Sequence, residues 1–118
     1  MFDFDMNGVK WMIKEVEQKT FWEDDHQEFK DNGTYYFGRC KVDTLEIWLW
    51  KDIASIEQKK KTLYHELMHA YIYSYISFND VQYDIDTFCD ISANSHDLIH
   101  NIVDNYFRMK YGMPEEDD

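Results

Sequence analysis

The stretch from residue 55 to about residue 76 constrains the fold most, because it has no glycine or proline and repeats apolar residues at helical spacing. The members of this apolar stripe are Ile56, Leu63, Leu67 and Ala70. Ser55 and Gln58 have the spacing of a capping box, in which two side chains satisfy the first backbone N–H groups of a helix. We therefore expect one long amphipathic helix here.

Strand patterns precede this helix. Residues 44–50, with the sequence TLEIWLW, alternate apolar side chains on one face with Glu46, Trp48 and Trp50 on the other. Residues 34–37 are rich in strand formers and follow a turn signal at residues 31–33. The two strands are expected to form an antiparallel hairpin closed near residues 40–43. Residues 9–16 fit either a strand or a short helix.

A second helical pattern runs from about residue 81 to residue 109. Its apolar stripe consists of Phe88, Ile91, Leu98, Ile102 and Tyr106. Ser92, Asn94 and Ser95 mark a place where this helix can break or kink. The order of the elements predicts the α+β class, with a small antiparallel sheet followed by two helices. We expect one domain over residues 1–113 and a disordered acidic tail over residues 114–118.

Composition limits the possible partners. The 118 residues carry a formal charge of -12, which disfavours direct binding to nucleic acid. A basic protein, including a DNA-binding one, is a compatible partner, and solubility is the simpler reason for the charge. The first residues lack the pattern of a signal peptide, and no apolar run reaches the length of a membrane span. We expect a cytoplasmic protein in which Cys40 and Cys89 are reduced, partly buried thiols.

The segment His65-Glu66-Leu67-Met68-His69 carries the chemistry. Histidines four residues apart on a helix project from one face, so both imidazoles can bind one Zn²⁺ ion. Glu66 is rotated by about 100° from His65, which places it beside a zinc-bound water rather than on the metal. A carboxylate there can act as the general base that activates the water. A structural zinc site, a degenerate former enzyme and two solvent-facing histidines without metal are the alternatives.

The residue that completes the zinc shell is open. The longer metzincin motif is excluded, because Ile72 and Tyr75 stand where it requires glycine and histidine. The downstream candidates are Asp84, Asp86, Asp90, His96 and His100. On one straight helix Asp86 and Asp90 lie opposite the apolar stripe, which is ordinarily the solvated face.

From Thr44 onward the chain resembles the small zincin metallopeptidases of bacteria, phages and mobile elements, the ImmA/IrrE-like group. The likeness covers residues 33–107 and rests on TLEIWLW, KDIASIEQKKK, TLYHELMHAYIY and DIDTFCDIS, in that order. It implies that Asp86, in place of the family's glutamate, is the third zinc ligand and that Asp90 supports a ligand histidine from the second shell. It also implies that residues 44–50 form the sheet edge that pairs with an extended substrate, and that repressor-type or other regulatory DNA-binding proteins are substrates.

Other residues receive simpler interpretations. The candidates to stabilise an oxyanion are Tyr64, Tyr71, Tyr73 and Tyr83, although packing in the core or at the surface is the expected role of each. Trp48 and Trp50 are expected to pack in the core, and Lys59, Lys60 and Lys61 to form a solvated patch.

Two functions follow from these features. The first is a zinc endopeptidase that hydrolyses peptide bonds of a protein substrate, with Glu66 as the base. The second is a non-catalytic acidic protein of a phage or mobile element. Such a protein would use the same scaffold to bind and inhibit a basic nucleic-acid-binding host protein.

Overall fold

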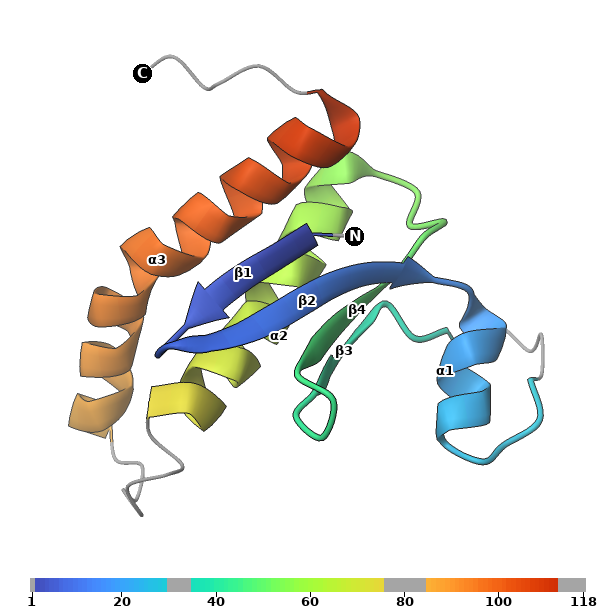
Figure 1. The fold of residues 1–118 in the computed structure, drawn as a ribbon, viewed down its shortest axis with the longest axis horizontal. Coiled ribbons are helices and arrows are strands. Elements are labelled where there is room, and N and C mark those ends of the chain that lie inside the picture. The colour runs from blue at the N-terminus through green and yellow to red at the C-terminus, as the bar shows by residue number, and fades with distance from the viewer. Residues whose placement is uncertain (1, 30–34, 76–84, 113–118) are drawn as a thin grey trace.

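The computed structural model describes residues 2–29, 35–75 and 85–112, with the backbone alone for residues 85–94. A small sheet and two long helices form two layers (Figure 1), which confirms the α+β class. In chain order the elements are β1 (Phe2–Met6), β2 (Val9–Val16), α1 (Gln18–Asp24), β3 (Gly38–Lys41), β4 (Glu46–Trp50), α2 (Ile56–Tyr75) and α3 (Ile85–Tyr111). No helix among these is long and apolar enough to cross a membrane.

The four strands lie in the order β1-β2-β4-β3. The pair β3–β4 is antiparallel, as expected of that hairpin, and β1–β2 is antiparallel as well, whereas β2 and β4 are parallel. The sheet is therefore mixed, because two antiparallel hairpins are joined by the parallel pairing of β2 with β4. β4 lies inside the sheet and β3 forms its edge. The expectation that residues 44–50 form the edge is wrong; that role belongs to the strand before them.

Both hairpins close with residues suited to tight turns. Asn7 and Gly8 join β1 to β2 with φ values of 52° and 76°, which is the positive-φ pair that a two-residue type I′ turn requires. The β3–β4 hairpin closes over residues 42–45 rather than 40–43. Its first strand begins at Gly38, and residues 35–37 are not in a strand. Residues 31–34, with the expected turn signal, lie outside the described residues.

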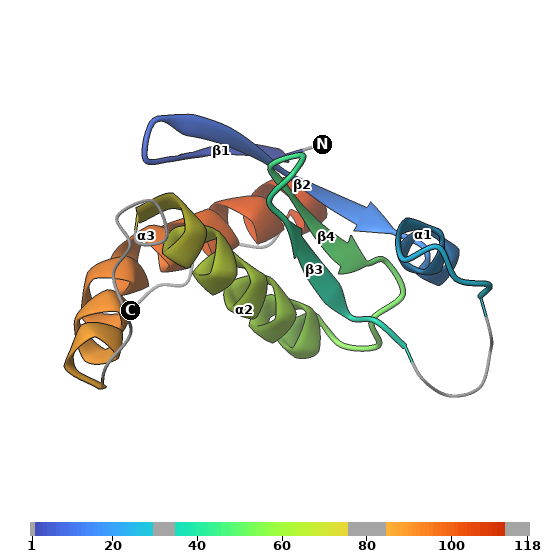
Figure 2. The same ribbon diagram turned by 90° about the horizontal axis from the view of Figure 1, so that it is seen from below.

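The helices match the sequence patterns closely. α2 begins at Ile56, and the Ser55 hydroxyl accepts a hydrogen bond of 3.0 Å from the backbone N–H of Gln58, as the capping pattern predicted. α3 is one continuous helix through Ser92–Ser95, so no break occurs there. Its ribbon nevertheless changes direction part-way along (Figures 1 and 2). Residues 9–16 form a strand, β2.

The two faces of the sheet are covered unequally. α2 and α3 cover one face, whereas the shorter α1 covers part of the other (Figures 1 and 2). Ile47 and Leu49 of β4 are fully buried on the α2 face, and Trp48 between them packs edge-on against Phe21 of α1, with ring centroids 5.8 Å apart. Trp48 is therefore a packing residue on the α1 face.

A buried ion pair joins the sheet to both long helices. Lys59, on the first turn of α2, donates hydrogen bonds to Glu15 of β2 at 2.7 Å, to the Lys51 carbonyl at 3.0 Å and to the Tyr111 hydroxyl at 2.8 Å. The Tyr106 and Tyr111 hydroxyls donate to the other oxygen of Glu15 at 2.5 and 2.7 Å. The side chains of Lys59 and Glu15 are only 5% and 8% exposed. The prediction of a solvated patch is therefore wrong for Lys59, although Lys61 is exposed.

Replacement of Lys59 with Met should strongly destabilise the protein, because it leaves the Glu15 carboxylate buried without its cation. We expect a loss of about 3–5 kcal/mol in the free energy of unfolding, measured by urea titration. Lys61→Met, two residues further along α2, is the matched control and should change stability little. The double variant Lys59→Met/Glu15→Gln should recover part of the loss. Equal losses of stability in Lys59→Met and Lys61→Met would contradict this role of the ion pair.

Candidate metal centre

α2 carries three neighbouring stripes of side chains, because residues four apart lie on one helical face. The first stripe contacts α3, where the Ser95 hydroxyl donates to a methionine sulfur at 3.4 Å and His96 bonds a tyrosine hydroxyl at 3.3 Å. The second stripe faces β3, and the third lies between these two and is exposed. Tyr64 and Met68 form the first stripe, which faces α3. Thr62 and Glu66 form the second, which faces β3, and His65 and His69 form the exposed third stripe.

The two histidines lie close enough to share one ion. Their Nε2 atoms are 3.2 Å apart, and their ring centroids are 4.8 Å apart. Two nitrogens that each bind a tetrahedral zinc ion at about 2.0–2.1 Å are separated by about 3.3–3.4 Å. His65 and His69 therefore fit the spacing of two ligands of one zinc ion. The same distance also accommodates a hydrogen bond from the Nε2–H of one ring to the bare Nε2 of the other.

Glu66 is a buried carboxylate beside this pair. The residue is 9% exposed, and no hydrogen bond or ion pair with a described residue holds its carboxylate. Burial raises the pKa of Glu66 above its ordinary value, while His65, His69 and Arg39 oppose that rise with their positive charge. A buried carboxylate without a partner, next to two potential metal ligands, has the position and basicity that a general base needs.

Gly38 of β3 allows the sheet to approach α2 closely at this point. A Cβ on Gly38 would lie 2.7 Å from Thr62 Cγ2, 3.0 Å from Glu66 Cγ and 3.2 Å from the Trp48 carbonyl oxygen. Real Cβ contacts are essentially never as short as the first of these distances. A side chain here would force Thr62 or β3 to shift, and a lone glycine in a strand is the sequence signal for such an approach.

Two hollows flank this contact and share Gly38 and Glu66; together we call them the groove. The hollow at the His69 end has a volume of about 470 Å³ and the hollow at the His65 end about 340 Å³. The side chains found only at the His69 end include Tyr36, Cys40, Val42, Ile72 and Tyr73. Those found only at the His65 end are Phe37, Gln58, Lys61, Thr62 and His65. A separate cavity of about 490 Å³ beside β2 and the end of α3 contains no histidine.

The edge strand presents backbone groups along the groove. The Trp50 N–H donates to the Phe37 carbonyl at 2.8 Å, so residues 37 and 50 form a hydrogen-bonded pair. Hydrogen-bonded and non-hydrogen-bonded pairs alternate along antiparallel strands, so Gly38 and Cys40 belong to non-hydrogen-bonded pairs. Their N–H and C=O groups therefore point away from β4. Because β3 is the last strand of the sheet, these groups face its open edge. An extended peptide can pair with them.

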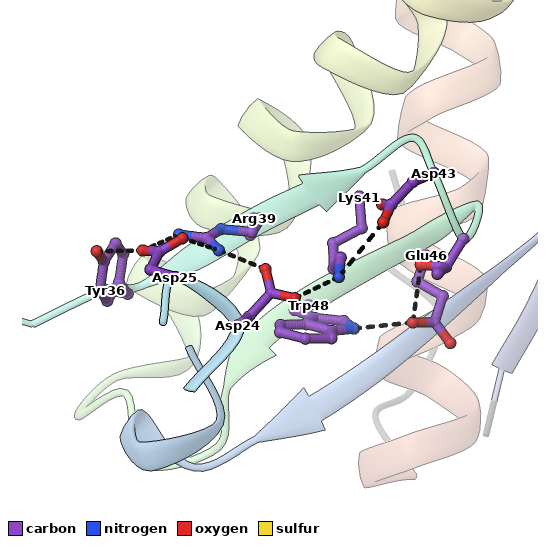
Figure 3. A network of polar contacts seen from close by, with 9 residues as sticks. Asp24, Asp25, Tyr36, Arg39, Lys41, Asp43, Glu46 and Trp48 are labelled. Carbon is purple, nitrogen blue, oxygen red and sulfur yellow. Dashed lines mark hydrogen bonds and ion pairs between the residues drawn. The ribbon is translucent and has the colours of Figure 1, made fainter. Parts of the chain in front are cut away.

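The other face of β3 is fastened to α1 by a network of charges (Figure 3). The Arg39 guanidinium donates to Asp24 once and to Asp25 twice, each bond 2.7 Å long, and Tyr36 donates to Asp25 at 2.5 Å. Lys41 donates to Asp24 at 2.5 Å. The network therefore holds β3 on the face opposite the groove. Neither the network nor α1 was predicted, because neither carries a motif and the network partners are about 15 residues apart in the chain.

The described residues do not supply a third ligand. They contain no group of three or more His, Cys, Asp or Glu side chains that could hold a metal ion. His96 bonds Tyr64, and His100 pairs with Asp104 at 3.1 Å, so neither joins the two motif histidines. Asp84 lies outside the described residues, and the structure gives only the backbone of Asp86 and Asp90.

The backbone of α3 still places these two aspartates relative to α2. Ser95 lies beside Met68, and the two helices are antiparallel (Figure 1). Asp86 and Asp90 precede Ser95, on the first part of α3, which turns away from the end of α2 (Figure 2). At about 1.5 Å per residue, Asp90 is nearer than Asp86 to the level of Ser95, by about one helical turn.

The remaining candidates take different places. Tyr73 lines the groove, whereas Tyr64 bonds His96, and Tyr71 packs against the tilted ring of Tyr75 with centroids 4.6 Å apart. Tyr83 and the side chain of Cys89 lie outside the described residues. Cys40 is a free thiol in the groove, and burial, with the Glu66 charge nearby, raises its pKa to about 12. Without a bound metal, Cys40 is therefore a neutral thiol in the lining of the groove.

Comparisons with protein-family models, curated proteins and solved structures found no match for this chain.

Gly38→Ala should destabilise the protein by about 1–3 kcal/mol, because the added methyl group overlaps Thr62 and pushes β3 away from α2. Chemical denaturation measures the change. Thr62→Ser removes the overlapping methyl group and keeps the hydroxyl, so the double variant should recover part of the loss. If the change in the double variant equals the sum of the changes in the two single variants, the Thr62 methyl group does not limit the approach of β3 to α2.

Stability should fall in acid partly through Asp25. Hydrogen bonds from Arg39, then from Tyr36, lower the pKa of Asp25 from 3.8 to about 2. A lowered carboxylate pKa stabilises the fold above the unfolded-state value, and this contribution disappears as the pH falls from about 4 through 2. Urea unfolding between pH 6 and pH 2 should therefore show a smaller acid loss for Asp25→Asn than for the wild type. The exposed Asp52→Asn is the control, and equal slopes for all three proteins would contradict the role of Asp25.

Proposed function

We propose that this protein is a zinc-dependent endopeptidase whose active site is the groove between β3 and α2. The observation that carries the proposal is the buried, unpartnered Glu66 carboxylate next to two Nε2 atoms that are 3.2 Å apart. A structural zinc site needs no free carboxylate beside it. Hydrolysis needs one, because a proton must leave the attacking water.

His65 and His69 would hold the ion, and α3 would supply the third ligand. The resemblance to ImmA/IrrE-like zincins assigns Asp86 as that ligand and Asp90 as the residue that orients a ligand histidine. The exposed histidine stripe lies between the stripes that contact α3 and β3, so a ligand from α3 approaches from the side opposite Glu66. Bound zinc supplies a Lewis acid that lowers the pKa of water to about 7 and polarises a carbonyl oxygen.

The residues of the chain perform the remaining tasks. Gly38 and Cys40 align an extended peptide along the open edge through their backbone groups. Glu66 takes a proton from the water that attacks the scissile carbonyl. The protonated Glu66 then gives this proton to the leaving amine, which completes hydrolysis and restores the carboxylate. Burial supports this cycle, because it raises the proton affinity of Glu66.

Zinc analysis and peptide cleavage together test the proposal. The wild-type protein, purified without chelator and supplied with zinc, should hold about one zinc ion per chain, because two imidazoles and an α3 carboxylate form a catalytic shell. His65→Ala and His69→Ala should lose the metal. His100→Ala, which alters an exposed histidine paired with Asp104, is the matched control and should keep it.

Glu66→Gln separates catalysis from metal binding. This variant should retain zinc and lose about 10²–10⁴-fold in the cleavage rate of a mixture of randomised synthetic peptides, measured by mass spectrometry. Absence of near-stoichiometric zinc in the wild type would refute the metal site, and undiminished cleavage by Glu66→Gln would refute the assigned base. If Glu66→Gln kept zinc and full biological activity, the acidic binding protein would be the correct function.

A further inference from the structure

The groove has two chemically different ends. The hollow at the His69 end is lined by the aromatic and aliphatic residues Tyr36, Val42, Ile72 and Tyr73, and by Arg39, whose charge is paired with Asp24 and Asp25. The hollow at the His65 end contains Lys61, which is exposed and makes no hydrogen bond or ion pair with a described residue. Glu57, one turn earlier on α2, is not within ion-pair distance of it. Lys61 is therefore an available cation one turn from His65.

The directions of β3 and α2 orient a bound peptide. Phe37 lies beside Gln58 and Lys61, and Val42 lies beside Ile72 and Tyr73, so the two elements run side by side in the same direction (Figure 2). Antiparallel pairing is the more stable and more frequent way for a strand to join an edge. A peptide antiparallel to β3 enters at the Val42 end and leaves at the Phe37 end.

This orientation assigns each hollow to one side of the scissile bond. Glu66 lies where the hollows meet, so the bond to be cleaved lies over that point. Residues before the bond then occupy the apolar His69 end, and residues after it occupy the His65 end beside Lys61. Because water is partly excluded from a hollow, a charge pair there is screened less than on an open surface.

We propose that Lys61 selects substrates with an acidic side chain at one of the first two positions after the cleaved bond, and that a bulky apolar side chain precedes the bond. This specificity rests on the proposed peptidase function. It concerns only the local sequence at the bond, whereas the charge of -12 acts on the whole partner. A largely basic protein with one acidic residue beside the cleavage site satisfies both conditions.

Cleavage of a randomised peptide library by the zinc-loaded full-length protein tests the specificity. Mass spectrometry of the products should show Asp and Glu enriched after the cleaved bond and apolar residues before it. A matched pair of peptides that differ only by Glu or Lys after the bond then gives kcat/KM values. The wild type should have the higher kcat/KM for the Glu peptide. Lys61→Glu should change the ratio of the two values by about tenfold in favour of the Lys peptide, because attraction of the acidic side chain becomes repulsion.

Lys60→Glu is the matched control, because it makes the same charge change one residue away. Lys60 lies over the Phe107 ring at 5.6 Å, on the α3 side of the helix, and does not line the groove. The ratio should stay close to the wild-type value in this variant. High salt should reduce the wild-type preference and leave cleavage itself intact.

The outcomes separate the two proposals. If cleavage depends on Glu66 but acids are not enriched after the bond, or if Lys61→Glu behaves like Lys60→Glu, the specificity is refuted and the peptidase stands. Enrichment of acids before the bond would refute the antiparallel orientation. If the zinc-loaded protein cleaves no peptide in the library, the peptidase function and this specificity fall together.

Discussion

The candidate site depends on the absence of one side chain. Because Gly38 has no Cβ, β3 comes within van der Waals contact of Thr62 and Glu66 on α2. That contact buries the Glu66 carboxylate and brings the free edge of the sheet next to the histidine pair. If β3 lay farther away, Glu66 would be hydrated, its pKa would be closer to the ordinary value and the edge would not lie beside the histidines. One backbone contact thus couples the proposed base, the proposed peptide-pairing strand and the proposed metal ligands.

Forces on both sides of the sheet maintain this contact. On the α1 side, Arg39 and Lys41 bind Asp24 and Asp25, so β3 is held along its length (Figure 3). At the far end of α2, the Glu15–Lys59 ion pair fixes the first turn of the helix against β2. Charge pairs with good geometry and low exposure restrict motion more than they add net stability. Their effect here is to fix where α2 and β3 meet.

Local sequence patterns predicted what depends on local interactions. The Ser55 cap, the extent of α2, the orientation of Ile47 and Leu49 and the histidine spacing all follow from periodicity or from contacts within one helical turn. The first strand and the Asn7-Gly8 turn were not predicted, although this residue pair is typical of a two-residue hairpin turn.

Long-range features could not be predicted in this way. The burial of Lys59 depends on Glu15, 44 residues earlier, and the identity of the edge strand depends on how the two hairpins dock. Charged residues such as Lys59 and Arg39 look alike in sequence whether they are solvated or paired. The geometry of the histidine pair was predictable because both rings belong to one helix, whereas a third ligand from α3 would depend on how α3 packs against α2.

The parallel pairing of β2 with β4 has a consequence for how the chain folds. Each hairpin forms from neighbouring residues, but the strands that join the hairpins are separated by α1 and β3, with partners such as Met12 and Glu46. The central seam of the sheet therefore closes a loop of more than 30 residues, and the entropy of that closure must be overcome before the seam is stabilised. Until the seam has closed, α2 lacks the complete sheet against which it packs. The groove lies between β3 and α2, so it is complete only when this seam has closed and α2 has packed against the sheet.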